Sequence, residues 1–377
     1  MAHKQALTRR SFVTSSIGLA VSSAFRARAR TRNAEPAGPI VEPLRLSRNE
    51  SPYGLSPSAS EAMRNAIDPK SCRYPIDEPK ALEEAIAKRF GVEKENVLLG
   101  CGSIEILRMA TETFCNSSRP AVVAEPTFEA VVSTCPFVHA RPIKINLTAD
   151  HKHDMRRMLR AGHGAGLIFL CNPSNPAGTL VEKEPVGRFV RSLPRGAVLL
   201  SDEAYAEYVD RSDYESCLRY VKAGLPVVVS RTFSKIYGMA GLRVGYAIGR
   251  KDLIERMAKR RLANNPNQLA TAAALAALIN DDEFVKRVRR LNAEVREYVC
   301  RELRAMGLAF IPSETNFVMI GVGRPAQPLI EELQKRKVLV GRLFPSLPEH
   351  LRVSFGTMAE MKVFVREFRE VMNSQIA

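Results

Sequence analysis

The chain has 377 residues, of which 45% are hydrophobic and 25% charged, so it belongs to the ordinary soluble globular class and is long enough for two domains or one elaborated α/β domain. Its formal net charge of +16 would suit a nucleic-acid-binding protein, but seven of the positive charges lie within residues 1–34, which hold no acid. The remaining charge of about +9 (16 − 7) is spread over the rest of the chain without a nucleic-acid-binding motif. The seven cysteines form no CxxC pair, which argues against a zinc site and against a disulfide framework.

Residues 1–34 are predicted to be an export leader. A weakly apolar run at residues 13–25 is too short and too rich in serine to span a bilayer, and an A-x-A site follows at residues 27–29. The sequence RRSF at residues 9–12 resembles the bacterial twin-arginine signal, which exports folded proteins. We therefore expect a periplasmic location, and the alternative is a basic tail on a cytoplasmic protein.

Beyond a linker at residues 35–43, short apolar segments alternate with helical patterns such as residues 184–194. Predicted strands cover residues 96–102, 120–126, 166–173, 197–205 and 226–235. Continuous apolar strands that alternate with helices indicate a buried, mainly parallel sheet. After about residue 262, long amphipathic helices and strands at residues 314–322 and 350–357 predict a smaller α+β unit.

Polar residues follow the predicted strands at the points where these strands end. Ser103, Asn175, Asp202 and Lys235 each occupy such a position. Because the carboxyl ends of parallel strands meet at one edge of a sheet, we expect a single site there. Taken one by one, these residues have ordinary interpretations: Asp202 as a helix cap, Asn175 as a turn residue, and Arg243 as the partner of a surface acid.

Taken together, the motifs resemble the fold-type I pyridoxal-phosphate aminotransferases of class I/II, and within them the histidinol-phosphate aminotransferase branch. The resemblance rests on NESPYG (49–54), RYP (73–75), GCGSIEIL (100–107), EPTFEAV (125–131), CNPSNPAG (171–178), DEAY (202–205), RTFSKIYGMAGLRVGY (231–246), ETNF (314–317), VGRLFP (340–345) and LRVSFGT (351–357). It implies an α/β fold with a mainly parallel sheet flanked by helices. The expected domains are an N-terminal arm at residues 35–60 joined to the small domain, a large cofactor-binding domain at 61–262 and a small α+β domain at 263–377.

The resemblance implies pyridoxal 5′-phosphate as cofactor. Lys235 would hold it as a Schiff base and then move a proton at the substrate Cα, while Asp202 would keep the ring nitrogen protonated. Asn175 and Tyr205 would hydrogen-bond the phenolic oxygen of the cofactor, and Phe128 would stack on its ring. The phosphate would bind to Gly102, Ser103, Ile104, Thr232, Ser234 and Arg243.

The resemblance also implies how substrate and partner subunit contribute. Arg352 would bind the substrate carboxylate beside Asn175, and Arg342 would add a second positive charge for a phosphate or a dicarboxylate, unless it is simply a solvated arginine. In the expected homodimer, Tyr74 would reach the cofactor phosphate of the partner subunit, and Tyr53 would reach its substrate pocket. We expect no metal, no nucleic acid and no membrane insertion after removal of the leader.

The expected activity is transfer of an amino group, by a ping-pong route, between an amino acid or amine and a 2-oxo acid such as 2-oxoglutarate. The donor would be histidinol phosphate or an aromatic amino acid, or the enzyme would accept a broad range of amino acids. The alternative is a pyridoxal-phosphate-dependent lyase or decarboxylase, because fold and cofactor motif do not separate the two reactions. A regulatory protein of this fold would carry a fused helix-turn-helix, and we find no such motif.

Overall fold

The computed structural model describes residues 43–68 and 72–374 of the chain. These residues belong to one compact unit, residues 41–377. The predicted export leader lies outside the described residues. In the described part of the chain, no helix combines the length and the apolar character that crossing a membrane requires.

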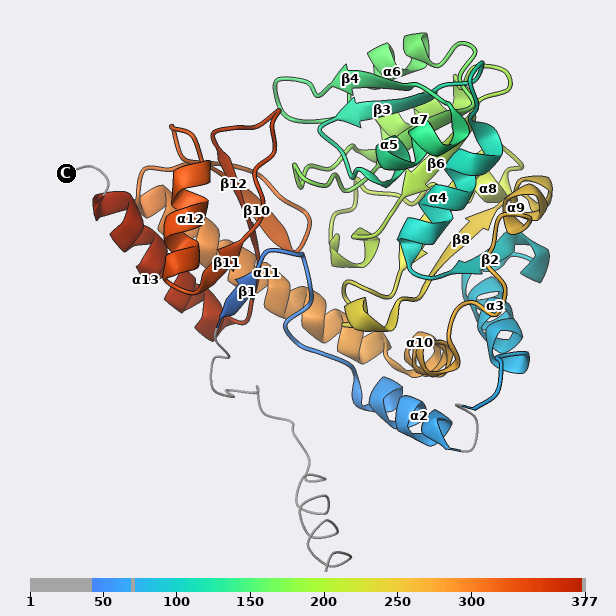
Figure 1. Ribbon diagram of the computed structural model, residues 1–377, viewed down its shortest axis with the longest axis horizontal. Helices are drawn as coiled ribbons and strands as arrows, with labels where there is room; N and C mark the ends of the chain where they lie inside the picture. The colour runs from blue at the N-terminus through green and yellow to red at the C-terminus, as the bar shows by residue number, and fades with distance from the viewer. Residues whose placement is uncertain (1–42, 69–71, 375–377) are drawn as a thin grey trace, which may run out of the picture. The chain divides into compact units, whose positions relative to one another are not determined.

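The largest sheet confirms the expected α/β fold (Figure 1). Its strands are β2 (Val97–Gly100), β3 (Ala121–Glu125), β4 (Pro142–Asn146), β5 (Leu167–Cys171), β6 (Val198–Asp202), β7 (Val227–Thr232) and β8 (Gly245–Gly249), in the spatial order β2-β8-β7-β6-β5-β3-β4. Only β8 runs against its neighbours, while the pairs from β7 through β4 are parallel. The five strands expected from apolar runs are all present, whereas β4 and β8 were not predicted.

Helices cover both faces of this sheet, which explains why its strands are apolar at nearly every position (Figure 1). The helices of this part of the chain, of which α2 packs on α10 rather than on the sheet, are α2 (Pro57–Ile67), α3 (Asp77–Phe90), α4 (Ser103–Phe114), α5 (Ala130–Thr134), α6 (Met155–Ala161), α7 (Lys183–Arg191), α8 (Leu218–Lys222), α9 (Lys251–Ala258) and α10 (Gln268–Asn280). Short 3₁₀ turns are η1 (Lys94–Asn96), η2 (Cys135–Val138), η3 (Ala206–Tyr208) and η4 (Ala240–Leu242). Along β5, Leu167 and Phe169 pack into the core beneath α4, α5 and α9. Ile168 and Leu170 pack into the opposite core, so side chains alternate between the two faces.

Two smaller sheets lie beside the first. Strand β1 (Leu44–Leu46) pairs in parallel with β11 (Val338–Val340), and the antiparallel sheet contains β12 (His350–Ser354), β10 (Phe317–Gly321) and β9 (Ala309–Ile311) in that order. Helices α11 (Asp282–Ala305), α12 (Gln327–Lys335) and α13 (Met358–Ser374) complete this part. Strand β1 thus joins the segment before α2 to the C-terminal part of the chain.

The hydrophobic cores divide within helix α11. Val285 and Val288 pack into the core of the large sheet, whereas Val295 and Val299 pack into the core beneath the smaller sheets. The long helix therefore connects the two cores. The domain limits at residues 60 and 262 stay a prediction, and the division of the cores favours a boundary within α11 over one at residue 262.

Candidate active site

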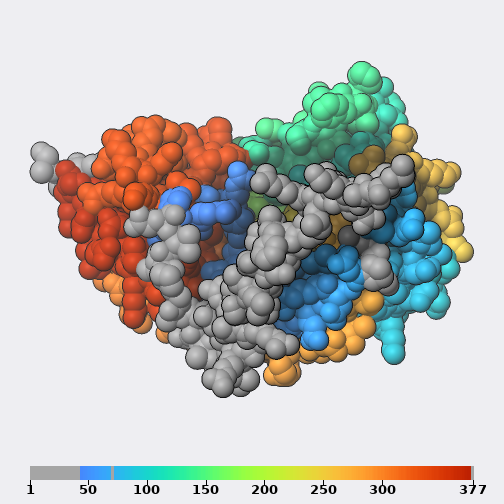
Figure 2. Space-filling model, turned by 60° about the horizontal axis from the view of Figure 1, so that its bottom comes forward, coloured from blue at the N-terminus to red at the C-terminus, as the bar shows by residue number. Residues whose placement is uncertain are grey.

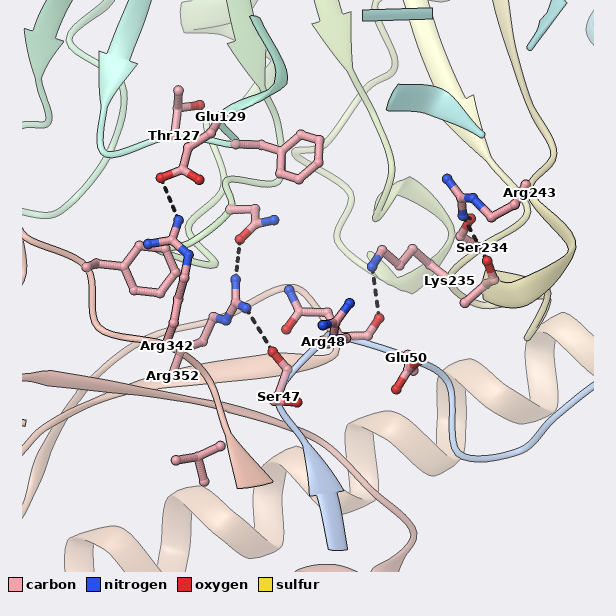
Figure 3. Close-up of a pocket in the computed structure, with 16 residues that line it drawn as sticks. Ser47, Arg48, Glu50, Thr127, Glu129, Ser234, Lys235, Arg243, Arg342 and Arg352 are labelled. Atoms are coloured by element: carbon pink, nitrogen blue, oxygen red, sulfur yellow. Dashed lines mark hydrogen bonds and ion pairs between the residues drawn. The ribbon is translucent and has the colours of Figure 1, made fainter. Parts of the chain in front are cut away.

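A cavity of about 750 Å³ opens where the strand ends of the large sheet face the smaller sheets (Figure 3). Its walls come from the segment after β1, from loops that follow β3, β5 and β7, and from the segment between β11 and β12. Seven of the residues expected at the site line this cavity, namely Phe128, Asn175, Ser234, Lys235, Arg243, Arg342 and Arg352. Residues from strand ends far apart in the sequence therefore meet in one place.

Lys235 follows the end of β7 and extends into the cavity (Figure 3). Its Nζ donates a hydrogen bond to the backbone oxygen of Asn49 at 3.0 Å and lies 5.5 Å from the centre of the Tyr205 ring. Burial, reinforced by the positive charge of Arg352 and opposed by the carboxylate of Asp202, lowers the Lys235 pKa to about 8. An amine with this pKa is partly neutral at physiological pH, which a nucleophilic or proton-accepting lysine requires.

Asp202 ends β6, and its register partner on the adjacent strand β7 is Ser230. The residue is only 2% exposed, and its Oδ1 has no hydrogen-bond partner among the described residues. Burial raises the pKa of this carboxyl to about 7, and the positive charge of Lys235 opposes the rise. A buried carboxylate is stable only with a cationic partner, so the site suits a positively charged ligand atom.

The neighbouring acid, Glu203, is also buried, but it has a cationic partner within the chain. Arg231 Nη2 donates to Glu203 Oε2 at 2.8 Å, and the backbone amide of Cys217 donates to Oε1 at 2.7 Å. Among the described residues no arginine pairs with Asp202, and the charge of Lys235 is the main influence that opposes the rise of its pKa. The ring nitrogen of pyridoxal phosphate, protonated in its active form, fits this carboxylate.

Asn49 connects Lys235, Tyr205 and strand β12. Its Nδ2 donates to the Tyr205 hydroxyl at 3.0 Å, its Oδ1 accepts from Ser354 Oγ at 2.9 Å, and its backbone amide donates to the same Oγ at 2.8 Å. The residue has a φ of +55°, a left-handed conformation that asparagine tolerates better than most residues. No role was predicted for Asn49, although it opens the NESPYG motif; an asparagine beside the turn residues of that motif was the available signal.

The residues expected around the cofactor phosphate also lie together. Gly102 caps the N-terminus of α4 with a φ of +74°, and a Cβ at this position would clash with the Arg243 guanidinium. Arg243 Nη1 lies 3.3 Å from Ser234 Oγ, and Thr232 Oγ1 donates to that Oγ at 2.9 Å. A Cβ on Gly245 would come within 2.5 Å of the Ser103 amide, so bare backbone borders the helix start. This cradle of hydroxyls, guanidinium and helix N-terminus suits a phosphate.

Ile104 contributes to this end of the site only through its backbone. Its side chain is 48% exposed and does not line the cavity. Its position in the first turn of α4 leaves the amide without an intrahelical partner, as at any helix start. The expected phosphate contact of Ile104 therefore depends on this amide alone.

Arg352 lines the same cavity from strand β12. Its Nη1 donates to Asn175 Oδ1 at 2.8 Å and its Nη2 donates to the Ser47 carbonyl at 3.1 Å, while Nε has no partner among the described residues. The guanidinium lies 5.1 Å from the centre of the Phe344 ring. Burial lowers the Arg352 pKa, and the positive charge of Arg342 adds to that shift. An arginine bound only to neutral oxygens has its charge available for a ligand carboxylate.

Arg342 lies at the mouth of the cavity and already has a carboxylate partner (Figure 3). Its Nη2 is 2.5 Å from Glu129 Oε1, and the two side chains are 50% and 63% exposed. Its guanidinium also lies 4.3 Å from the centre of the Phe344 ring. A second positive charge was predicted here, whereas the contributions of Glu129, next to Phe128, and of Phe344 were not.

Tyr53 and Tyr74 do not line the cavity of their own chain. Tyr74 is 76% exposed, and Tyr53 packs half-buried against the core of the large sheet. Their expected contacts with a partner subunit stay a prediction.

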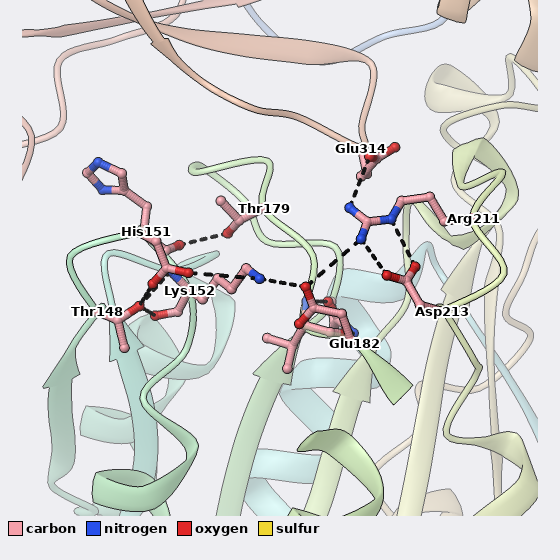
Figure 4. Close-up of polar contacts among 11 residues, drawn as sticks. Thr148, His151, Lys152, Thr179, Glu182, Arg211, Asp213 and Glu314 are labelled. Carbon is pink, nitrogen blue, oxygen red and sulfur yellow. Dashed lines mark hydrogen bonds and ion pairs between the residues drawn. The ribbon is translucent and has the colours of Figure 1, made fainter. Parts of the chain in front are cut away.

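The ETNF motif joins the segment before β10 to loops around the large sheet (Figure 4). Glu314 lies 3.6 Å from Arg211 Nη1 and 2.9 Å from Arg296 Nη1. Asn316 Nδ2 donates to the Asn49 backbone oxygen at 3.1 Å, which is the same oxygen that binds Lys235. The motif thus holds the backbone oxygen that Lys235 also contacts, and its residues do not line the cavity.

The chain is similar to known proteins in both sequence and fold. The family model for aminotransferase class I and II matches residues 41–368. The chain is 36% identical over 337 residues to the histidinol-phosphate aminotransferase of Moorella thermoacetica, covering 88% of this chain and 86% of that protein. The structure of histidinol-phosphate aminotransferase from Sinorhizobium meliloti in complex with pyridoxal-5′-phosphate is 28% identical, covers 88% of this chain and 91% of that one, and has a TM-score of 0.82. L-threonine-O-3-phosphate decarboxylase from Porphyromonas gingivalis is 21% identical, with 87% and 99% coverage and a TM-score of 0.76.

The chain therefore belongs to the aminotransferase class I and II family. Its fold is that of the fold-type I enzymes, it is an aminotransferase, and its cofactor is pyridoxal phosphate, as the resemblance implied. The similarity to the decarboxylase concerns the fold alone, so the lyase alternative has less support than aminotransfer.

Proposed function

We propose that this aminotransferase moves an amino group between an amino acid or amine and a 2-oxo acid such as 2-oxoglutarate, with histidinol phosphate or an aromatic amino acid as donor. One observation carries the proposal: the Lys235 amine and the Arg352 guanidinium line one cavity, and the charge of Lys235 acts on the carboxylate of Asp202, which is buried at the end of β6. This arrangement offers a nucleophile, a counter-ion and a carboxylate-binding group at one site.

When bound, pyridoxal phosphate supplies an aldehyde carbon for a covalent bond and a ring that withdraws electrons from the substrate Cα. Asp202 would hold the proton on the ring nitrogen, and Asn49 would orient the Tyr205 hydroxyl toward the phenolic oxygen. Ser234 and Arg243 would bind the phosphate. Lys235, whose amine is partly neutral, would act as the base that takes the proton from the substrate Cα and, once protonated, as the acid that gives it back.

The carboxylate of an amino-acid or 2-oxo-acid substrate would bind to Arg352, and histidinol phosphate, which has no carboxylate, would bind there through its phosphate. The rest of the substrate would then point toward Arg342, Glu129 and Phe344. Phe344 and Phe128 provide aromatic surface beside this path. Histidinol phosphate and aromatic amino acids both combine a ring with a polar end, so both donors remain in the proposal.

A donor panel tests the proposed reaction. Purified holoenzyme is incubated with 2-oxoglutarate and, in turn, histidinol phosphate, phenylalanine, tyrosine and aspartate, and both glutamate and carbon dioxide are measured. We expect glutamate without carbon dioxide, and Lys235→Ala should remove both this turnover and the visible absorption band of the bound cofactor. Carbon dioxide without glutamate would identify a lyase instead.

A homodimer with shared active sites is part of the proposal. Exposed apolar side chains Ile67, Tyr74, Ile76 and Ile279 belong to α2, to the segment before α3 and to α10, and these helices pack on one another. Figure 2 shows α2 and α3 (blue to cyan) at the surface of the molecule. A solvent-exposed apolar surface of this kind favours contact with a second subunit.

Sedimentation and mixing experiments test the dimer. We expect the mass of two chains in sedimentation equilibrium. Coexpression of Tyr74→Ala with Lys235→Ala should restore activity in part, because mixed dimers would contain one site with both native residues. A monomer with full activity, or no recovery on mixing, contradicts shared sites.

We also propose export through the twin-arginine pathway, because residues 9–12 read RRSF ahead of a short, weakly apolar segment. In a bacterial host, the wild-type protein should appear in the periplasmic fraction. Replacement of Arg9 and Arg10 by lysine should retain it in the cytoplasm. Equal distribution of both forms would favour a cytoplasmic enzyme with a basic tail.

A further inference from the structure

Two arginines that line the cavity both lie close to one aromatic ring. The guanidinium carbons of Arg352 and Arg342 lie 5.1 Å and 4.3 Å from the centre of the Phe344 ring. Among the described residues, Arg352 is bound only to neutral oxygens, those of Asn175 and Ser47, and no carboxylate pairs with it. Arg342 is bound to the carboxylate of Glu129, so its charge is compensated. Arg352 can therefore bind an anionic ligand directly, whereas Arg342 is already paired with a carboxylate.

Glu129 comes from the opposite wall of the cavity. It follows Phe128 in the turn between β3 and α5, whereas Arg342 lies between β11 and β12 (Figure 3). The ion pair therefore bridges the large sheet and the smaller sheets across the cavity mouth. Because both side chains are at least half-exposed, such a pair stabilises the fold by about 1 kcal/mol or less, so a ligand can separate it at little cost.

We propose that Glu129 is a specificity-determining residue. Its carboxylate pairs with the guanidinium of Arg342. A distal carboxylate or phosphate of a substrate would otherwise bind to that guanidinium. The cavity then favours substrates whose distal group is uncharged, and it accepts a distal anion only by displacing Glu129 from Arg342. This inference rests on the proposed function, since it assumes that the substrate carboxylate is bound by Arg352.

Arg48 is the other cation to consider at the mouth. It is exposed, lines the same cavity, and has no ion pair within the described residues. Glu50, its neighbour in the cavity wall, is paired with Arg45 at 2.9 Å. A distal anion could therefore be held by Arg48 without any change at Glu129, and the experiment must separate these two routes.

Inhibition by two acids of equal length tests the proposal on the holoenzyme. Glutarate carries a distal carboxylate, and pentanoate has a methyl group in its place. The measured quantity is the ratio of the two inhibition constants. Glu129→Gln removes the competing charge while it keeps the shape of the side chain, so the preference for glutarate should rise about tenfold, because 1.4 kcal/mol is a modest value for one close charge.

Three further variants separate the possible causes. Arg342→Gln should abolish the gain when combined with Glu129→Gln. Glu294→Gln, which removes a half-exposed glutamate that pairs with Arg290 on α11, should leave the ratio within twofold. If Glu129→Gln leaves the ratio unchanged, or if Arg48→Gln abolishes the gain of Glu129→Gln as fully as Arg342→Gln does, the proposal is wrong.

The failure of this inference can be told apart from the failure of the proposed function. A cofactor band and glutamate formation by the wild-type protein test the function, whereas the ratio of inhibition constants tests only Glu129. An active enzyme with an unchanged ratio would overturn the inference and leave the function intact. A protein without the band would overturn the function first.

Discussion

The two ends of the cavity follow different physical rules. At the inner end are Lys235 and Arg352, together with Asp202, which is buried and does not line the cavity itself; burial is the main cause of the pKa shift of each. At the mouth, Arg342 and Glu129 are at least half-exposed and bind mainly each other. Buried charges are costly to change, and exposed pairs are not. The difference teaches that the reaction chemistry is held rigidly inside, while substrate preference can be altered at the mouth.

The largest effect should come from Asp202→Asn. The amide keeps the shape but cannot offer a negative charge to a cationic ring nitrogen, so the turnover number should fall about 10³-fold. Turnover is measured at saturating donor with equal cofactor content, as judged by absorbance. The matched control is Asp210→Asn, an exposed aspartate 3.9 Å from Arg289, which should change turnover less than twofold. Similar losses in both variants would contradict a special role of the inner end.

Asn49→Ala should affect both folding and activity. It leaves the Tyr205 hydroxyl without a partner among the described residues and removes the acceptor of the Ser354 hydroxyl, which should lower the free energy of unfolding by about 1–3 kcal/mol. Turnover should also fall, because Tyr205 loses the group that orients it. Asn96→Ala removes a half-buried asparagine bonded to the Gly249 carbonyl and should lower stability without affecting turnover. Urea denaturation and a steady-state assay on both variants decide this.

The pKa of Lys235 predicts a pH dependence. Because burial lowers the pKa from 10.5 to about 8, the neutral fraction of this amine rises roughly tenfold between pH 7 and pH 9 and changes little above pH 9. The rate at which the apoprotein captures pyridoxal phosphate should follow this rise, measured by stopped-flow absorbance. A rate that continues to climb up to pH 10.5 would show an ordinary lysine and remove the contrast between the two ends.

The smallest effect is expected at the mouth. Glu129→Gln breaks only an exposed pair, so the free energy of unfolding should change by about 1 kcal/mol or less. Glu203→Gln, which leaves the buried Arg231 short of a partner, should cost about 3–5 kcal/mol. Equal costs in urea denaturation would mean that the mouth is as tightly integrated as the interior.

The sequence predicted the inner end better than the mouth. Asp202 and Lys235 directly follow apolar strands, and the edge of a parallel sheet brings such positions together, so a local pattern was enough. The mainly parallel sheet was predicted for the same reason. Strand β8 was missed, since its residues lie in a glycine-rich motif rather than in a continuous apolar run.

The roles of Asn49 and Glu129 could not be predicted from local patterns. Asn49 and Ser354, which hydrogen-bond each other, are 305 positions apart, and Glu129 meets Arg342 from another sheet. Such contacts depend on how loops from separate cores approach each other, and neither hydrophobic periodicity nor turn chemistry reports that. The export leader lies outside the described residues and stays a prediction.

The central claim is a covalent bond between the Lys235 amine and pyridoxal phosphate. Its most direct test is reduction of the holoenzyme with borohydride, followed by peptide mass mapping of the labelled lysine. The account predicts one phosphopyridoxyl group per chain, on Lys235. A label on another lysine, or a fully active enzyme that cannot be labelled, would contradict it.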